Sequence, residues 1–140
     1  WRKFWNVFKK KEKEKERDLI MKLKNDTTEI KQEIINEFEI PKETLENFNV
    51  IIWDYTYENY NGSAFLLLQD KNTNKLYEVN GSHCSCYGLE GQFELEEVTK
   101  KELMFRLVNN KNYGIDDDYG ITHNFRNDLI KFLNDYSDVI

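Results

Sequence analysis

The sequence contains little proline, cysteine or glycine, and it has no long apolar run. Because Pro41 is the only proline, a proline-rich linker or recognition segment is excluded. Two cysteines are too few for the disulfide framework of a small secreted protein, so a reducing cytoplasm is the expected location. The sequence shows neither a stretch long enough to cross a bilayer nor the apolar core of a signal peptide.

Acidic and basic residues are unevenly distributed along the chain. Residues 1–24 carry ten Lys or Arg and four Asp or Glu, whereas residues 25–140 carry ten basic and twenty-two acidic residues. Such an acidic body repels nucleic acid and attracts basic surfaces. We therefore expect no direct nucleic-acid binding by the body, and a partner such as a basic, nucleic-acid-handling protein complex.

The N-terminal segment has the pattern of a basic amphipathic helix over residues 1–25. Its apolar residues recur at helical spacing, as Trp1, Phe4, Trp5 and Phe8. Three roles remain open for this helix: membrane contact by residues 1–10, capture by a partner or a second copy in a homodimer, and packing onto its own domain. Residues 26–140 form the second predicted unit, a single acidic domain.

The predicted elements of this domain change in type along the chain. A capping pattern at Asp26–Glu29 predicts a helix with the core face Ile30, Ile34, Ile35 and Phe38. Residues rich in β-branched and aromatic types predict strands at 50–57, 63–69, 75–79 and 93–96, with Asn61-Gly62 as a hairpin turn. Two helices follow, one capped by Thr99 with the face Leu103, Met104 and Leu107, and one over 122–136 with Phe125, Leu129, Phe132 and Leu133. The order predicts an α+β fold: a four-stranded antiparallel meander flanked by N- and C-terminal helices that cover one face.

Residues 80–92 are the most distinctive part of the sequence. This stretch contains both cysteines, one of the two histidines and three of the six glycines. Glycine adopts backbone conformations that other residues resist, so a shaped polar loop is expected from Gly81 to Gln92.

The cysteines and histidines of the chain raise the question of a metal or thiol site. Tetrahedral zinc sites need four ligands, and the candidates are Cys84, Cys86, His83 and His123. The CxC spacing differs from the usual CxxC. A nucleophilic Cys84 with His123 as its base is a further alternative, and inert, reduced thiols are the third. We expect no Cys84–Cys86 disulfide, because strand geometry holds the Cα atoms of residues i and i+2 near the upper limit for bridging.

The segments Trp53–Phe65 and Tyr77–Gln92 resemble small uncharacterised proteins of bacteriophages and prophages. The resemblance covers about residues 50–107, and the loop Gly81-Ser82-His83-Cys84-Ser85-Cys86-Tyr87-Gly88-Leu89-Glu90-Gly91-Gln92 is its specific part. It implies a mobile-element origin and brings no activity with it. Phage accessory proteins often inhibit host defence systems, so by analogy of context alone we expect an inhibitor of such a system, as an anti-CRISPR protein is.

These observations lead to one expected function and one alternative. The expected function is that of a non-enzymatic accessory protein, without a cofactor, that binds a host protein. The expected binding residues are Trp53, Tyr55, Ser82, His83, Cys84, Ser85, Cys86, Tyr87, Glu90 and Gln92. The alternative is a Cys/His site, either a structural zinc site or a cysteine-dependent enzyme.

Overall fold

The computed structural model of the chain describes residues 3, 6, 9, 10, 24–58, 60–117 and 120–137. The predicted helix at residues 1–25, with its four aromatic residues, falls outside the described residues except for a few positions. Among the helices in the described part of the chain, none combines the length and the apolar character needed to cross a membrane.

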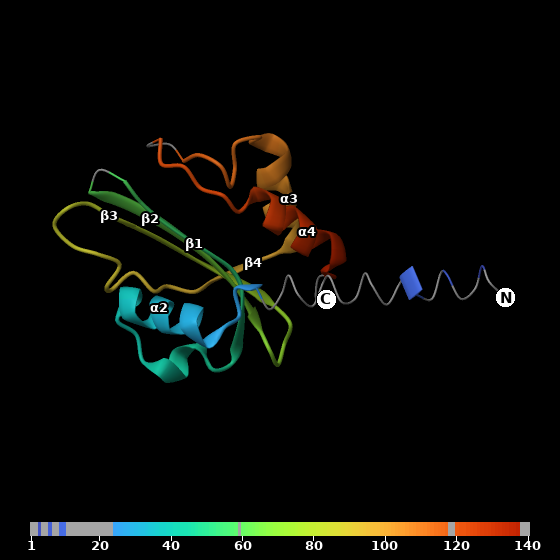
Figure 1. Cartoon of the computed structure of the whole chain (residues 1–140), viewed down its shortest axis with the longest axis horizontal. Coiled ribbons are helices and arrows are strands. Elements are labelled where there is room, and N and C mark those ends of the chain that lie inside the picture. The colour runs from blue at the N-terminus through green and yellow to red at the C-terminus, as the bar shows by residue number, and fades with distance from the viewer. Residues whose placement is uncertain are drawn as a thin grey trace.

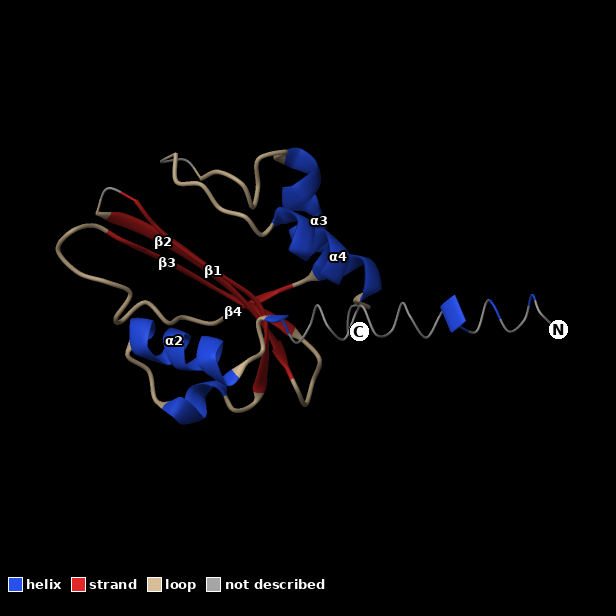
Figure 2. Ribbon diagram, viewed as in Figure 1, coloured by secondary structure: helices blue, strands red, loops and turns tan. Residues whose placement is uncertain are grey.

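The body is a four-stranded antiparallel sheet with helices before and after it in sequence, which confirms the predicted α+β meander. The strands lie in the order β1-β2-β3-β4. Figure 2 shows them as a layer between helices. In chain order the elements are α2 (Thr28–Phe38), the 3-10 helix η1 (Lys42–Leu45), β1 (Phe48–Glu58), β2 (Asn61–Asp70), β3 (Leu76–His83), β4 (Glu96–Val98), α3 (Lys100–Asn109) and α4 (Arg126–Asp135).

Helices cover both faces of the sheet, so the prediction that they cover a single face is wrong. Figure 1 shows α2 on one side of the strands and α3 and α4 on the other. Strand β2 serves both cores: Leu66 and Leu68 join the cluster under α2, whereas Phe65 and Leu67 join the cluster under α3 and α4. Six consecutive residues, 64–69, are buried for this reason. An uninterrupted apolar strand is typical of a sheet with two covered faces.

Strand β3 is longer than predicted, and β4 lies later in the chain. The β2–β3 ladder continues to the pair Gly62↔His83, so residues 81–83 belong to the strand rather than to the loop. The hairpin between β1 and β2 joins Glu58 to Asn61, and Tyr60 takes a left-handed φ of 67° there. The assignment of Asn61-Gly62 to the turn is therefore wrong, because Gly62 is already paired in β2.

The helix caps are partly as predicted. Thr99 and Glu102 form the full capping box of α3. Helix α2 is capped by Thr27 rather than by Asp26, whose carboxylate accepts a hydrogen bond from the Val50 amide of β1. Met104 is 46% exposed, so its assignment to the core is wrong, and Leu103 and Leu107 alone form the buried face of α3. Helix α4 begins at Arg126 instead of residue 122, with the predicted apolar face buried.

Candidate binding site at the end of the sheet

The ring of His83 lies across the end of β2 and reaches β1. Gly62 is opposite His83 in the ladder, and a side-chain carbon on Gly62 would collide with the imidazole. The Tyr55 hydroxyl lies 2.5 Å from His83 Nε2, and the Tyr57 ring lies 5.0 Å from the imidazole at an angle of 36°. Glycine near the start of β2 therefore lets the His83 ring of β3 pass over that strand and contact the tyrosine rings of β1.

The hydrogen bonds of His83 define its tautomer when the ring is neutral. Nδ1 lies 3.0 Å from the Cys84 carbonyl oxygen, which can only accept a hydrogen bond. Nδ1 therefore carries the proton, and Nε2 accepts a hydrogen bond from the Tyr55 hydroxyl. Burial, together with the nearby Glu37 carboxylate, raises the pKa of Tyr55 above its ordinary value, so the hydroxyl keeps its proton as a donor.

The loop after β3 is held in place by one apolar and one polar anchor. Leu89 is fully buried in the core under α2, and it packs where a side chain on Gly81 would otherwise lie. The Gln92 side chain accepts a hydrogen bond of 2.8 Å from the Ser82 amide and donates one of 3.0 Å to the Gly88 carbonyl. Gln92 thus occupies the edge of β3 beyond the last residue pair with β4. Its side chain holds the loop against the strand, whereas the sequence predicted that it would contact a binding partner.

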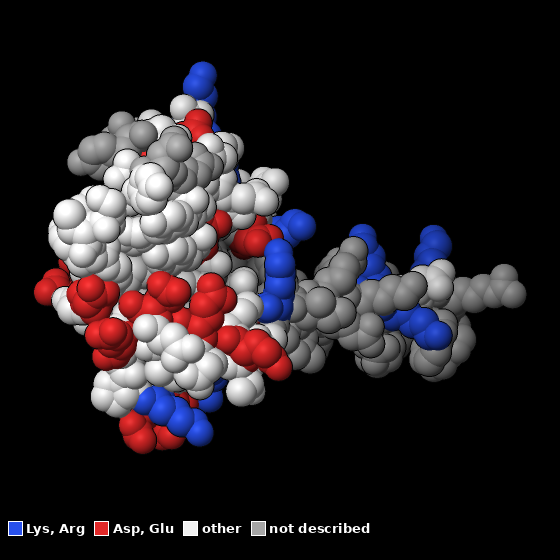
Figure 3. Space-filling view, turned by 60° about the vertical axis from the view of Figure 1, so that its left-hand side comes forward, with Lys and Arg blue, Asp and Glu red and all other residues white. Residues whose placement is uncertain are grey.

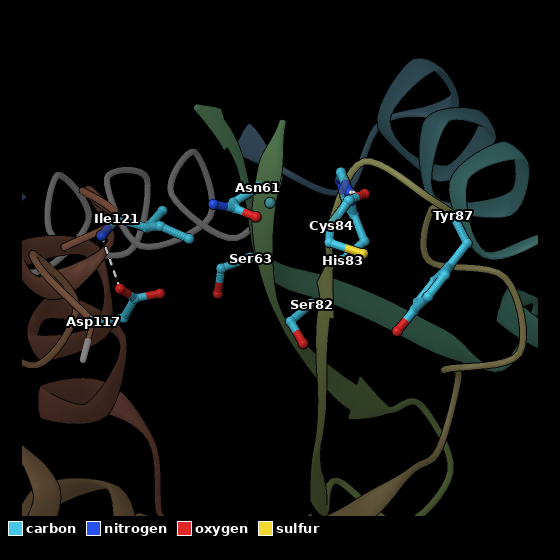
Figure 4. Close-up of a pocket in the computed structure, with 9 residues that line it drawn as sticks. Asn61, Ser63, Ser82, His83, Cys84, Tyr87, Asp117 and Ile121 are labelled. Atoms are coloured by element: carbon cyan, nitrogen blue, oxygen red, sulfur yellow. Dashed lines mark hydrogen bonds between the residues drawn. The ribbon is translucent and has the colours of Figure 1, made fainter. Parts of the chain in front are cut away.

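A polar pocket of about 380 Å³ opens at this end of the sheet. Figure 4 shows its lining residues, which come from β2, from β3 and the loop after it, and from the segment before α4. They are Asn61, Gly62, Ser63, Ser82, His83, Cys84, Tyr87, Asp117 and Ile121. Tyr57, Tyr60 and Tyr87 are each more than half exposed. The end of the sheet therefore presents aromatic rings beside hydroxyl and amide groups, a combination suited to binding a partner.

The four candidate metal ligands are not brought together. His123 is buried, and its Nδ1 lies 2.6 Å from a carboxylate oxygen of Asp54. Asp54 precedes Tyr55 on β1, and consecutive strand residues point to opposite faces, so His123 and His83 lie on different sides of the sheet. Within the described ranges, no group of three His, Cys, Asp or Glu side chains could hold a metal ion. The partner of His123 Nδ1 is the Asp54 carboxylate rather than the Cys84 thiol.

The two cysteines are exposed and lie close to each other in a turn. The geometric argument against their contact fails, because it assumed a strand. Hydrogen bonds from the Cys86 amide, and then from its thiol, lower the pKa of the Cys84 thiol. The thiolate is the reactive form of cysteine, so the lowered pKa raises the reactive fraction of Cys84 near neutral pH.

We expect Cys84 to react with iodoacetamide at a lower pH in the folded protein than in urea. The measurement uses the single-thiol variant Cys86→Ala, with the alkylation rate followed by mass spectrometry from pH 6 to 10, with and without urea. The rate for the folded protein should reach half its maximum at the lower pH, because the backbone amide at position 86 remains as a donor. Coincident profiles with and without urea would contradict the hydrogen-bonded turn.

The remaining predicted residues have differing environments. Trp53 is half-buried, and its ring lies 5.9 Å from that of Phe38, so it belongs to the core under α2. Ser85 and Glu90 are exposed on the loop. Gly62, Ser63 and Tyr60 were missed by sequence reasoning. For Tyr60, its aromatic side chain beside the predicted turn Asn61-Gly62 was a signal of a binding residue. For Gly62 there was none, because its role depends on its pairing with His83.

No protein-family model matches the chain, and no match is found among curated proteins or solved structures.

Proposed function

We propose that the chain is a non-enzymatic accessory protein of phage or prophage type, whose acidic face binds a basic host protein. A nucleic-acid-handling component of a defence system is the proposed class of target, and inhibition through occupation of its basic surface is the proposed effect. The distribution of charge on α2 is the observation that supports this proposal most directly.

Helix α2 carries an acidic ladder, Glu29, Glu33 and Glu37, spaced by four residues. Glu29 and Glu33 are exposed, and Glu37 is partly so. None of the ion pairs found within the described part of the chain involves these three carboxylates. Like charges at this spacing destabilise a helix by about 0.2–0.5 kcal/mol per pair. The four-residue spacing of the charges therefore does not stabilise the helix, although Glu29 in its first turn complements the helix dipole, whereas binding to a basic surface gains from all three charges.

The acidic ladder continues into the aromatic end of the sheet. Glu37 and Glu90 both lie close enough to Tyr55 to raise the pKa of its hydroxyl by their negative charge. Figure 3 shows Asp and Glu side chains gathered in a band across one face of the molecule. Carboxylates and exposed tyrosine rings suit lysine and arginine side chains, which bind the first by charge and the second by cation–π contact.

Neutralising the acidic ladder should weaken binding while leaving the fold intact. We expect Glu29→Gln/Glu33→Gln/Glu37→Gln to reduce capture of basic proteins from a bacterial lysate by roughly tenfold, since each lost charge contributes up to about 1 kcal/mol. The free energy of unfolding should change by no more than about 1 kcal/mol, because the loss of two like-charge pairs offsets the loss of the Glu29 charge at the N-terminus of the helix. Quantitative mass spectrometry of the captured proteins and urea denaturation measure the two effects.

The matched control removes three exposed acidic groups from other elements, in Glu96→Gln/Glu97→Gln/Asp135→Asn. This variant has the same net charge as the first and should retain most of the capture. Equal losses in both variants would show that only net charge matters. Unchanged capture in both would contradict the proposed function.

A second candidate function is covalent capture of a partner that carries a disulfide, favoured by the exposure of the Cys84 thiol and its lowered pKa. In this step the Cys84 thiolate attacks one sulfur of the partner's disulfide, a mixed disulfide forms, and the other partner sulfur leaves as a thiolate. If it holds, Cys84→Ser should abolish capture, and a reducing agent should release the captured proteins from the wild-type chain. Capture that survives both treatments would exclude this second candidate and leave the acidic face as the binding surface.

A further inference from the structure

The backbone groups of β1 that point away from the sheet can be assigned from the pairing of β1 with β2 and of β2 with β3. The Ser82 amide donates to Gln92 on the outer side of β3, so Ser82 and Ser63 form a pair without mutual hydrogen bonds. Ser63 therefore turns its amide and carbonyl toward β1, to Thr56. Because orientation alternates along a strand, the neighbours of Thr56 on β1, Tyr55 and Tyr57, turn theirs outward.

The start of the outer edge of β1 confirms this assignment. The bulge between Val50 and Ile52 shifts the alternation by one residue, so Val50, which pairs with Leu68, turns its amide outward. This amide donates to the Asp26 carboxylate at 2.9 Å. The Ile51 carbonyl accepts a hydrogen bond of 3.0 Å from the Asn25 side-chain amide. Residues just before α2 thus cover the first part of this edge with side chains.

The second part of the edge has no such cover. Trp53, Tyr55 and Tyr57 each direct an amide and a carbonyl outward, and no hydrogen bond from the described residues reaches these groups. The edge contains neither proline nor lysine, the residues that commonly block strand pairing. The opposite edge of the sheet differs, because β4 and the Gln92 side chain occupy it.

We propose that the outer edge of β1, from Trp53 to Tyr57, accepts an extended basic segment of the partner protein as an added strand. This inference rests on the proposed function and specifies how the partner is held. Main-chain hydrogen bonds to Trp53, Tyr55 and Tyr57 would provide affinity, and the side chains beside them would provide selectivity.

The surroundings of the edge determine which added strand fits. Side chains of an added strand alternate between the two faces of the sheet. On the α2 face they meet the half-exposed Tyr57 ring, the Tyr55 ring and the Glu37 carboxylate. Lysine or arginine at every second position would place a cation near both the rings and the carboxylate. On the other face Asp54 is already paired with His123, so an uncharged residue fits there.

A synthetic peptide of alternating lysine and valine, seven residues long, is the probe. We expect it to bind the full chain and to slow hydrogen exchange of the outward Tyr55 and Tyr57 amides, measured by NMR. A peptide in which glutamate replaces lysine should bind at least tenfold more weakly. The lysine peptide with N-methyl groups along its pairing edge should also bind at least tenfold more weakly.

The protein variant that tests the edge is Tyr57→Pro, and its matched control is Tyr57→Ala. Both remove the exposed ring, but only proline removes the outward amide, which no β1–β2 hydrogen bond uses. We expect Tyr57→Pro to bind the lysine peptide roughly tenfold more weakly than Tyr57→Ala, since it loses a hydrogen bond and introduces a ring at the contact. The N-methylated peptide makes the same comparison with wild-type protein, so the test holds even if Tyr57→Pro folds poorly.

Three results would overturn the added-strand proposal. The first is equal binding of the lysine peptide with and without N-methyl groups. The second is equal lysate capture by Tyr57→Pro and Tyr57→Ala, together with reduced capture by the Glu29/Glu33/Glu37 variant. That result would contradict the added strand but would still support the proposed function. The third is a concentration-dependent dimer, seen by sedimentation, that Tyr57→Pro dissociates and the peptide does not, because a second copy would then occupy the edge.

Discussion

Arg106→Met is expected to lower the free energy of unfolding by about 2–3 kcal/mol, because it removes the cation from a buried carboxylate and leaves the Asn80 side-chain amide as its remaining donor. Glu78 of β3 is only 4% exposed and faces α3. Arg106 Nη1 and Nη2 donate to its two oxygens at 2.7 and 3.2 Å, and Nη1 also lies 3.2 Å from the Tyr113 hydroxyl. These bonds hold α3 on the sheet.

Urea denaturation of a double-mutant cycle measures this effect. Glu78→Gln removes the charge, so adding it to Arg106→Met should recover part of the loss, and the coupling between the two sites should exceed about 1 kcal/mol. A loss below 1 kcal/mol for Arg106→Met alone would show that water or another cation replaces the guanidinium. In that case the Arg106–Glu78 ion pair would not be the contact that holds α3 on the sheet.

Leu89→Ala is expected to lower the free energy of unfolding by about 2–4 kcal/mol and to release the loop that follows β3. Leu89 is fully buried between Gly81 and the core under α2, so its truncation leaves a cavity. Because Leu89 also holds Gln92 near the strand edge, the Ser82 amide should lose its protection from hydrogen exchange.

The control for this prediction is Tyr87→Ala in the same loop. Tyr87 is 58% exposed, so its truncation should change stability by no more than about 0.5 kcal/mol. Exchange of the Ser82 amide should be unaffected in this variant. Protection of Ser82 that survives Leu89→Ala would mean that the Gln92 hydrogen bonds alone maintain the loop.

Local patterns in the sequence predicted most of the secondary structure. The Thr99 cap of α3 depends only on residues within one turn, and it is present as predicted. The change to β-branched and aromatic residues near position 50 identified β1. That both faces of the sheet are covered was not predicted. The run Ala64–Leu68 identifies a strand, but which helix packs against each of its side chains depends on the tertiary arrangement.

The site was only partly predictable, since its geometry depends on strand register. His83 and Tyr55 were both selected from sequence, yet their contact requires that Gly62 lie opposite His83. His123 was grouped with the cysteines by residue type alone, and the alternation of Asp54 and Tyr55 on β1 separates them. Sequence spacing carries no information on which of two residues 28 or 69 positions away will be a neighbour.

The side chain of Gln92 has a consequence for how this sheet could assemble with others. By occupying the outer amide of Ser82, it blocks strand addition at the end of β3 that extends past β4. The rest of that edge is the three-residue strand β4, whose Glu96 and Glu97 are exposed, and short, charged edge strands disfavour further pairing. Stacking into an open-ended fibre needs two growing sides, so these features disfavour assembly beyond a single addition at β1. Gln92→Ala would free the Ser82 amide, and a greater tendency to form longer aggregates is the expected result.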